Sequence, residues 1–532
     1  MIVIGGGVTG AGTARDCALR GLSVLLLEQA VYNHGASGRN HGLMHSGGRY
    51  AVTDPDSARE CAQENAVLRH IACHCVEATD GLFVTLDEDD LDFQQTFVNA
   101  CRQTGIKAEV ISPSLALMLE PSLNHAIKGA VRVPDAAIDP FALTQANLLD
   151  AVMHGATVRM HHQVTDLLVT NGRVKGVKAL DRRTGTTVEF RAAVTINAAG
   201  IWGSDLMARA GVTIKMFPAK GTILIFAQRL NHMVLNRCRR PANGDIIVPD
   251  GAVSMLGTTS DRIDMRDIDN LRATSEEVRQ LMQQGEMMVP KLAQTRLLRA
   301  FAGVRPLIAA DDDPSGRSIS RGIVLIDHDE RDGMQGIITI TGGKLITYRK
   351  MAEQATDLVC CKLGVNAPCT TADTPLPGSE SGKSARDVFS PSHRSSASKR
   401  HGTQAAAIPD SDPLDRTIVC ECENVSVGEI KYAIEQLGAK SMSELMRRTR
   451  LGMGRCQGKN CACRVAEVLA RVAGDAHQAQ AYLQQLIDER WKGIRPVAWG
   501  ATMREAQLTA AIYQGLCGLD KAVEVRKEVD EP

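Results

Sequence analysis

The sequence predicts an α/β protein with a dinucleotide-binding unit at its N-terminus and a small helical, cysteine-rich domain near its C-terminus. A glycine-rich turn lies between two apolar strands within residues 2–28, and later apolar strands also run into glycine turns. Beyond residue 420 the cysteines become regularly spaced. Because domains average about 150 residues, a chain of 532 residues has room for roughly three or four of them.

Charge and composition exclude several classes of protein. Lys plus Arg and Asp plus Glu both total 61, and this zero balance argues against the basic footprint of a nucleic-acid-binding protein. The hydrophobic fraction of 44% is typical of a globular protein. Neither a signal peptide nor an apolar run of about 20 residues is visible. We therefore expect the 15 cysteines to be thiols or metal ligands of a cytoplasmic protein rather than disulfides.

Residues 2–28 read as a strand, a glycine turn, a helix and a second strand. Gly5, Gly7 and Gly10 fit the G-x-G-x-x-G fingerprint, which lets the backbone approach a pyrophosphate at the helix N-terminus. Glu28 ends the second strand, where a carboxylate can accept hydrogen bonds from ribose hydroxyls. A lone fingerprint is a weak signal, but here all four elements agree. The segment is predicted to bind a dinucleotide.

The dinucleotide is predicted to be FAD rather than NAD. No second glycine fingerprint follows a strand, whereas a flavoenzyme that is reduced by NAD(P)H usually needs two such units. Ala199 and Gly343 lie in small-residue turns after apolar strands, and a helix is predicted from about residue 345 to 363. Val164 lies in a strand suited to contact the adenine. The order of these segments favours one flavin site.

The C-terminal cysteines form two pairs. Cys420 and Cys422 are followed by 33 residues and then by Cys456 and Cys461, and two helices are predicted between the pairs. Four thiolates from two short loops suit a tetrahedral-sulfur metal centre. The spacing resembles the [2Fe-2S] domain of the bacterioferritin-associated ferredoxin type. Zinc is the alternative metal, and Cys463 is the alternative to Cys461 as fourth ligand.

Four further motifs resemble those of the FAD-dependent glycerol-3-phosphate dehydrogenases. They are Gly38–Tyr50, Gly303–Leu307, Ser320–Gly322 and Gly343–Arg349. Together with the cysteine pairs they make nearly the whole chain similar to the catalytic large subunits of the anaerobic bacterial members of that family. The resemblance implies a Rossmann-like, D-amino-acid-oxidase-like two-domain flavoenzyme fused to a small [2Fe-2S] helical domain.

The resemblance also implies which residues contact FAD. They lie in the glycine fingerprint, the Gly38–Tyr50 motif, the adenine strand and the two later turns. The predicted set is Gly5, Gly7, Val8, Thr9, Gly10, Glu28, Ser37, Gly38, Arg39, Asn40, His45, Ser46, Val164, Ala199, Gly200, Trp202, Gly342, Gly343, Leu345 and Ile346.

A phosphomonoester substrate carries nearly two negative charges and needs cationic donors around its phosphate. Arg49, Tyr50, Arg305, Arg321 and Lys344 would line such a site by the same resemblance. Taken singly, an arginine beside a proline or in a strand turn is more often part of a surface ion pair. Their clustering in motifs already placed at the flavin favours glycerol 3-phosphate as the substrate.

The inferred reaction removes the C2 hydride of sn-glycerol 3-phosphate to the flavin and the hydroxyl proton to a base, which gives dihydroxyacetone phosphate. His45 suits the base by its ordinary pKa but could equally be a contact to the flavin. Lys344 or Arg305 could stabilise the developing alkoxide, and the sequence does not rank these roles. Related aerobic enzymes have a histidine in the segment that here reads Lys220–Ile223 and contains none.

The chain is predicted to divide into an FAD-dependent oxidoreductase domain at 1–365, a linker at 366–415, a [2Fe-2S] domain at 416–475 and a helical tail at 476–532. The linker is expected to be exposed because it is rich in Ser, Pro, Ala, Asp and His. It contains a basic patch that is expected to be solvated, formed by Arg394, Lys399, Arg400 and His401.

The resemblance also implies partners. A second flavoprotein subunit, together with a membrane-attached iron–sulfur subunit, would pass electrons to menaquinone in anaerobic respiration, and FMN could be present in that complex. The protein would then be peripheral on the inner face of the inner membrane. Four arginines lie near the second cysteine pair, namely Arg447, Arg448, Arg450 and Arg455. They could raise the cluster potential or dock an acidic partner. Alternatively, they form a solvated helix face.

Two alternative functions stay open on the sequence alone. One is an amine or 2-hydroxy-acid dehydrogenase of the same flavin fold. The other is a redox-sensing or metal-binding regulatory protein that keeps a vestigial flavin fold. The clustered Arg and Lys residues argue against the first, and the intact glycine fingerprint argues against the second.

Overall fold

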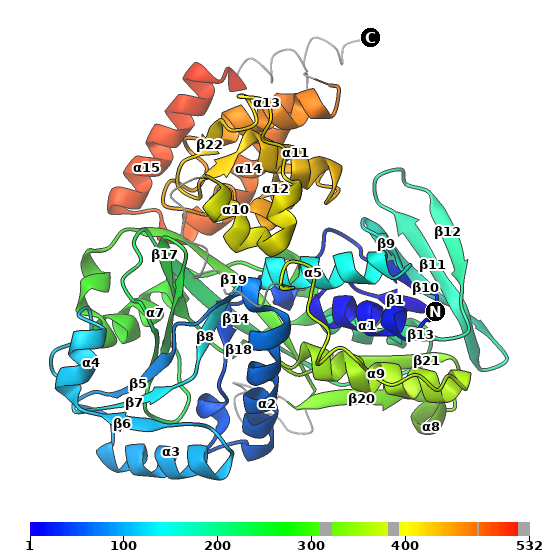
Figure 1. Cartoon of the computed structure of the whole chain (residues 1–532), viewed down its shortest axis with the longest axis horizontal. Coiled ribbons are helices and arrows are strands. Elements are labelled where there is room, and N and C mark those ends of the chain that lie inside the picture. Colours follow the sequence, from blue (N-terminus) through cyan, green and yellow to red (C-terminus); the bar gives the residue numbers. More distant parts are fainter. Residues whose placement is uncertain (309–321, 381–392, 476–477, 520–532) are drawn as a thin grey trace.

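The computed structural model describes residues 1–308, 322–380, 393–475 and 478–519 (Figure 1). It consists of a flavin-type α/β sheet, a large mostly antiparallel sheet, and a C-terminal helical domain that lies over both at the top of the view. The predicted α/β fold class is therefore confirmed. Within the described residues, no helix combines the length and apolar character that crossing a membrane requires.

The first sheet carries the glycine turn. Its order is β20-β21-β13-β1-β2-β9, with β1 parallel to both β13 and β2. The strands β1 and β2 are apolar throughout because both faces of the sheet are covered, by α1, α5 and α9 on one side and by a three-stranded sheet, β10-β11-β12, on the other. The bounds are β1 Ile2–Ile4, α1 Val8–Leu19, β2 Leu25–Leu27, α5 Pro140–Met153, β9 Thr157–Arg159, β10 His162–Thr170, β11 Arg173–Asp181, β12 Thr187–Arg191, β13 Thr195–Asn197, α6 Gly203–Arg209, β20 Ile323–Asp327, α8 His328–Asp332, β21 Ile337–Gly342 and α9 Tyr348–Leu363.

The large sheet has nine strands and stands beside the first. Its order is β18-β14-β17-β16-β15-β5-β7-β6, and β19 pairs along the length of β14. The helix α7 covers one face and begins with a capping box of Thr274 and Glu277. The bounds are β5 Gly81–Thr85, β6 Glu109–Ile111, α4 Pro113–Leu119, β7 Gly129–Val133, β14 Met216–Phe226, β15 Val234–Arg237, β16 Ile246–Asp250, β17 Val253–Gly257, β18 Asp261–Arg262, α7 Ser275–Met288 and β19 Leu297–Ile308.

A small third sheet, β3-β8-β4, joins these two units, and α2 packs on it, whereas α3 packs on β5 and β7 of the large sheet. The loop after β3 is held in place by Asp135, whose carboxylate accepts the N–H of Ser46 at 2.6 Å. This contact positions the end of the Gly38–Tyr50 motif. The bounds are β3 Leu43–Met44, α2 Pro55–Ile71, β4 Val76–Glu77, α3 Leu91–Gln103 and β8 Ala136–Ile138.

The C-terminal domain begins with a short hairpin that brings the first cysteine pair next to three helices. Its core joins α11, α12 and α13 to α14 from the tail. The bounds are α10 His393–His401, β22 Ile418–Cys420, β23 Val425–Ser426, α11 Val427–Glu435, α12 Met442–Thr449, α13 Ala462–Val472, α14 Gln478–Ile494, α15 Gly500–Ala511 and a π-helical turn at Ile512–Leu516.

The described part of segment 366–415 is not exposed throughout, so the prediction of an exposed linker is wrong for its buried residues, although residues 411–414 are exposed. Leu376 is fully buried, and His401 is only 6% exposed. Arg400 and His401 both bind Glu429 of α11, with the Arg400 Nη2 at 2.5 Å and the His401 Nε2 at 3.0 Å. The polar composition hid these contacts because each buried charge finds its partner far away in sequence. The side chain of Arg394 lies outside the described residues.

A buried ion pair between Glu64 of α2 and Arg349 of α9 joins the two helices. Arg349, in the last predicted family motif, donates from Nε and Nη2 to the two oxygens of Glu64 at 2.9 and 2.5 Å. Glu64→Gln should lower the free energy of unfolding by about 3 kcal/mol, because it leaves a buried guanidinium without its counter-charge. Differential scanning calorimetry of the holoprotein measures this loss. Glu353→Gln, which removes a more exposed partner of the same arginine, is the control; equal thermal midpoints for the two variants would contradict the account.

Candidate flavin cavity and thiol cluster

A cavity of about 450 Å³ runs from the glycine turn at the end of β1 to the ends of β14 and β19 in the large sheet. Most of the predicted flavin and substrate residues line it. They are Gly5, Gly7, Val8, Thr9, Glu28, Ser37, Arg39, Asn40, His45, Arg49, Tyr50, Val164, Ala199, Gly200, Trp202, Arg305, Gly342, Gly343, Lys344 and Leu345. The chain therefore gathers seven segments that are far apart in sequence.

Four predicted flavin residues do not line this cavity. Gly10 lies behind the turn against the Gly5 carbonyl, and Ile346 lies in the core at 2% exposed. Ser46 donates its N–H to Asp135, and Gly38 faces a neighbouring cavity. These four residues support the segments around the cavity but do not face its interior.

The turn after β1 lets a ligand come close to the backbone. Gly5 has φ +109°, and a Cβ there would lie 2.6 Å from the Ala198 carbonyl oxygen. The helix α1 starts at Val8 with Gly7 as its N-cap, and no side chain caps it. The Val8 N–H is held by the Ser37 hydroxyl at 3.0 Å. A helix N-terminus with this glycine cradle fits a pyrophosphate.

Glu28 closes the nucleotide end of the cavity. Its carboxylate accepts the N–H groups of Gly6 at 2.6 Å and Ala30 at 2.9 Å, and burial raises its pKa. The same carboxylate lines the cavity wall, where it can accept from ribose hydroxyls. Together with the glycine cradle, this donor and acceptor set fits FAD.

Arg305 stands at the far end of the cavity. It lies in β19, opposite Ala219 of β14. Its Nη2 donates to the Thr258 hydroxyl at 2.5 Å and to the Thr259 carbonyl at 3.1 Å, so the guanidinium is fixed in place. Thr258 also lines the cavity and was not predicted. The only sequence signal for it is a short polar run, 258–260, after the buried strand β17.

His45, Tyr50 and Lys344 form one group in the cavity. The rings of His45 and Tyr50 meet edge to face with centroids 5.3 Å apart, and the Lys344 ammonium lies 4.7 Å from the Tyr50 ring centroid. His45 and Tyr50 come from the segment after β3, and Lys344 comes from the turn after β21. The arrangement puts a titratable ring beside a cation within the same wall of the cavity.

Two of the predicted substrate residues, Arg49 and Arg321, are not simply free donors in the described cavity wall. Arg49 lines the cavity, but its Nη2 also contacts the fully buried Asp245 carboxylate at 3.2 Å, so part of its charge is already compensated. Arg321 lies outside the described residues. Lys220, in the segment that lacks a histidine, forms a buried ion pair with Glu277 at 2.8 Å. Lys220 therefore ties β14 to α7.

The four predicted cluster cysteines lie together. The Cys461 thiol hydrogen-bonds to Cys420 and Cys456 and lowers the pKa of both, and Cys456 also contacts Cys422. Cys463 pairs instead with Cys517. Within the described residues no group of three or more His, Cys, Asp or Glu side chains surrounds a single ion position. A two-iron cluster needs only two thiolates at each iron, so two linked cysteine pairs fit its donor set.

Backbone N–H groups and tail side chains support this site. The N–H of Gly452 donates to Cys420, and that of Gly458 donates to Cys456. The carbonyls of these glycines are bound from the tail, Gly452 by Arg490 at 2.6 Å and Gly458 by the Tyr513 hydroxyl at 2.8 Å. The tail was predicted only as helical, because nothing local in the sequence marks these contacts.

Two of the arginines near the second cysteine pair, Arg447 and Arg448, hydrogen-bond to backbone carbonyls. Arg447 donates to the Tyr32 carbonyl of the flavin domain at 2.5 Å, and Arg448 donates to carbonyls of its own domain. Both are partly or fully buried, as is Arg450, so a solvated helix face is the wrong interpretation for these three, whereas Arg455 is exposed.

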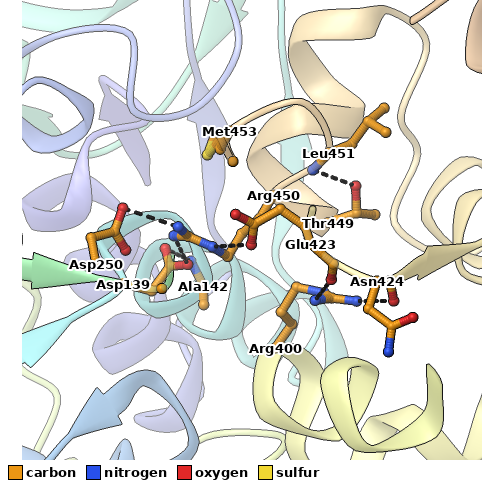
Figure 2. A network of polar contacts seen from close by, with 12 residues as sticks. Asp139, Ala142, Asp250, Arg400, Glu423, Asn424, Thr449, Arg450, Leu451 and Met453 are labelled. Atoms are coloured by element: carbon orange, nitrogen blue, oxygen red, sulfur yellow. Dashed lines mark hydrogen bonds and ion pairs between the residues drawn. The ribbon is translucent and has the colours of Figure 1, made fainter. Parts of the chain in front are cut away.

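Arg450 joins the cluster domain to both sheets (Figure 2). Its guanidinium binds Glu423 at 3.1 Å, Asp139 at 3.4 Å and Asp250 at 3.0 Å. Glu423 follows Cys422, Asp139 caps α5, and Asp250 ends β16. One side chain therefore connects the loop of the first cysteine pair to both parts of the oxidoreductase domain.

The fold and the two sites define an FAD-dependent oxidoreductase with its own iron–sulfur domain. Residues 1–349 match the family described as FAD dependent oxidoreductase, and residues 418–471 match the BFD-like [2Fe-2S] binding domain. The chain belongs to the family of anaerobic glycerol-3-phosphate dehydrogenase A subunits, since it is 55% identical to the member from Escherichia coli K12 over 98% of this chain and 97% of that one. The FAD and [2Fe-2S] predictions are confirmed at the level of these families.

More distant relatives agree. The corresponding protein of Haemophilus influenzae is 51% identical over 98% of this chain and 93% of its own, and that of Haloferax volcanii is 43% identical over 98% and 91%. Among solved structures, the glycerol-3-phosphate dehydrogenase of Bacillus halodurans complexed with FAD aligns with a TM-score of 0.68 and 24% identity, over 93% of this chain and 95% of that one. The last likeness supports the fold.

The glycine turn gives a direct test of cofactor binding. A methyl group at Gly10 would overlap the Gly5 carbonyl oxygen, so Gly10→Ala should displace the turn and reduce bound FAD at least tenfold. Visible absorbance of the purified protein measures the flavin. Gly515→Ala, where a Cβ meets nothing within 4 Å, is the matched control. Full flavin content in Gly10→Ala would contradict the assignment.

The thiol contacts distinguish the two possible fourth ligands. Cys461→Ser should lose most iron and acid-labile sulfide, because Cys461 bridges the two pairs, whereas Cys463→Ser should retain both. Chemical analysis of iron and sulfide and the EPR spectrum of the reduced protein are the measurements. The reverse pattern would assign Cys463, and stoichiometric zinc without sulfide in the unmodified protein would reject the cluster.

Proposed function

We propose that this chain oxidises sn-glycerol 3-phosphate to dihydroxyacetone phosphate with FAD as acceptor, as the large subunit of a quinone-linked dehydrogenase. The observation that carries this proposal is the cationic end of the flavin cavity, where Arg305 and Lys344 face the same space from different sheets. The relatives named as anaerobic glycerol-3-phosphate dehydrogenases, similar over nearly the whole chain, support the same substrate.

Arg305, Lys344 and Arg49, together with the Tyr50 hydroxyl, bind and orient the substrate in this proposal. A phosphate dianion is best held by forked guanidinium donors, and Arg305 is already fixed by Thr258 and Thr259. Arg321 belongs to the proposed set by sequence. Bound FAD supplies the acceptor for the hydrogen and electron pair that leave C2. FAD and substrate that displace water from the cavity would strengthen these charge interactions.

His45 is proposed as the base that takes the hydroxyl proton. Four histidines of the described chain line the cavity, His34, His41, His45 and His162, and His45 is the one whose ring meets Tyr50 beside the Lys344 ammonium. The Lys344 ammonium, beside the same Tyr50 ring, stabilises the alkoxide that forms as the proton leaves. In this proposal His45 removes the proton, and Lys344 stabilises the negative charge that results.

Cys420, Cys422, Cys456 and Cys461 are proposed to hold the [2Fe-2S] cluster, which supplies a one-electron carrier within the chain. The relatives are named as A subunits, which supports a complex of several subunits. We propose two partners, a second flavoprotein subunit plus a membrane-attached iron–sulfur subunit, with menaquinone as the acceptor beyond them and a peripheral position on the inner membrane. FMN is proposed at most as a further component of that complex.

Dye-reduction assays of the purified protein with glycerol 3-phosphate, sarcosine and lactate test the substrate class. The proposal predicts rapid turnover with glycerol 3-phosphate alone. Turnover with sarcosine or lactate but not with glycerol 3-phosphate would instead support an amine or 2-hydroxy-acid dehydrogenase.

Substitution of the two cations tests the site. Arg305→Met and Lys344→Met should each lower kcat/KM for glycerol 3-phosphate about 100-fold or more, because each removes a charge-stabilising donor from the reacting end of the cavity. Arg262→Gln, an exposed arginine on the same sheet, should keep the unmodified kcat/KM. Flavin content is measured alongside. If both Met variants kept full kcat/KM, the substrate would bind elsewhere.

A further inference from the structure

The peptide group that joins His45 to Ser46 is bound on both sides by buried side chains. The His45 ring lines the flavin cavity. The His45 carbonyl accepts the amide N–H of Asn65, from α2, at 3.1 Å. The Ser46 N–H donates to the carboxylate of Asp135, which precedes β8, at 2.6 Å. Both polar atoms of this one peptide group are therefore held by side chains from two different segments.

Asn65 is itself held in one orientation. It is 5% exposed, and its amide also reaches the carbonyls of Met44 at 3.4 Å and Pro134 at 3.3 Å. Its Oδ1 accepts the Nε of Arg69, one turn later in α2, at 2.8 Å. The Arg69 guanidinium also donates to the carbonyls of Pro134 at 2.9 Å and Asp135 at 3.2 Å. Because both its donor and its acceptor are engaged, the Asn65 side chain cannot rotate without losing hydrogen bonds.

Asp135 is fixed in a similar way. It is 1% exposed, and its second carboxylate oxygen accepts the amide of Asn236, a fully buried residue of β15, at 3.2 Å. A Cβ at Gly81 would lie 2.8 Å from the Asp135 Cβ, so the backbone of β5 packs closely against this side chain. The Ser46 hydroxyl in turn accepts the N–H of Gly48 at 3.3 Å. The restraint therefore continues toward the substrate residues that follow.

The segment also has no room to shift toward α2. Gly47 has φ +101°, and a Cβ there would overlap the Ala58 carbonyl oxygen of that helix. From this backbone the His45 ring reaches the cavity and meets the Tyr50 ring, with centroids 5.3 Å apart. The Lys344 ammonium lies 4.7 Å from the same Tyr50 ring. The place of the His45 ring in the cavity thus depends on how its backbone is held.

Proton transfer gives a reason for such a rigid backbone. A general base must lie within hydrogen-bond reach of the proton that it removes, and a misplacement of about 1 Å can lower a rate about 100-fold. Apolar residues of similar shape can replace a buried hydrogen-bonded pair at little cost in stability. Packing alone therefore does not require the polar side chains of Asn65 and Asp135, whereas hydrogen bonds to a defined peptide group fix its position.

We propose that Asn65 and Asp135, here called the peptide clamp, are positioning residues for proton removal from the substrate. They set the distance and direction from which the His45 ring approaches the C2 hydroxyl group. This proposal rests on the role of His45 as the base, proposed above. Arg49, which follows in the same segment, has its own anchor in Asp245 at 3.2 Å. The clamp therefore acts on proton removal more than on phosphate binding.

Two variants of nearly unchanged shape test the clamp in dye-reduction assays of the purified holoprotein. Asn65→Asp keeps the acceptor for Arg69 but removes the donor to the His45 carbonyl, and Asp135→Asn removes the charge and one of two acceptors. Each should lower kcat for glycerol 3-phosphate, per bound flavin, at least tenfold and change KM less than threefold. Each should also raise the solvent deuterium isotope effect on kcat, because proton removal becomes slower relative to the other steps.

Asn231→Asp is the matched control. Asn231 is a fully buried asparagine whose amide also donates to backbone carbonyls, those of Met233 at 2.7 Å and Ile247 at 3.2 Å, but it does not line the flavin cavity. This variant should lower the thermal midpoint as the clamp variants do, while its kcat and isotope effect stay those of the unmodified protein. Because kcat is expressed per bound flavin, partial loss of folded protein cannot imitate the expected effect.

His45→Gln separates this proposal from the one on which it rests. We expect it to lower kcat at least 100-fold. If it does so while either clamp variant keeps the kcat and isotope effect of Asn231→Asp, the clamp is overturned and the proposed base is not. If His45→Gln keeps full kcat, the base and the clamp are both overturned, because no proton transfer by His45 is left to position.

Discussion

The arrangement of the two redox sites depends on one buried guanidinium. Arg450 binds carboxylates from the loop of Cys422, from the start of α5 and from the end of β16, and its side chain is only 13% exposed. Its backbone has φ +60°, where α12 ends, and its side chain reaches Asp139 and Asp250 outside the cluster domain. Removing one partner of such a buried network costs about 3–5 kcal/mol, so the relative position of the two domains is firmly set.

With that position fixed, each site is built from segments that are distant in sequence. The flavin cavity combines a glycine cradle and Glu28 at one end with Arg305 and Lys344 at the other. The thiol cluster combines two loops of its own domain with Arg490 and Tyr513 of the tail, which lie beyond the matched [2Fe-2S] segment 418–471. The tail is thus part of the cluster site in the folded chain.

Local sequence patterns predicted the parts of the molecule that depend on local rules. The glycine fingerprint, the terminal acid Glu28 and the cysteine spacing each reflect a backbone or donor requirement that neighbouring residues reveal. Contacts such as Arg400 with Glu429, Arg305 with Thr258 and Arg490 with Gly452 could not be predicted, because each partner lies on a separate element. Composition alone therefore misjudged the buried residues in the described part of segment 366–415, such as Leu376 and His401, as exposed.

The central claim is that one chain carries both substrate oxidation and an iron–sulfur electron acceptor. Anaerobic addition of glycerol 3-phosphate to the purified holoprotein, without dye or partner subunits, tests it most directly, with flavin absorbance and the EPR signal of the reduced cluster recorded on the same sample. The account predicts that the flavin absorbance is lost and that the cluster signal appears. Loss of flavin absorbance with a cluster that stays oxidised, although dithionite reduces it, would contradict the account.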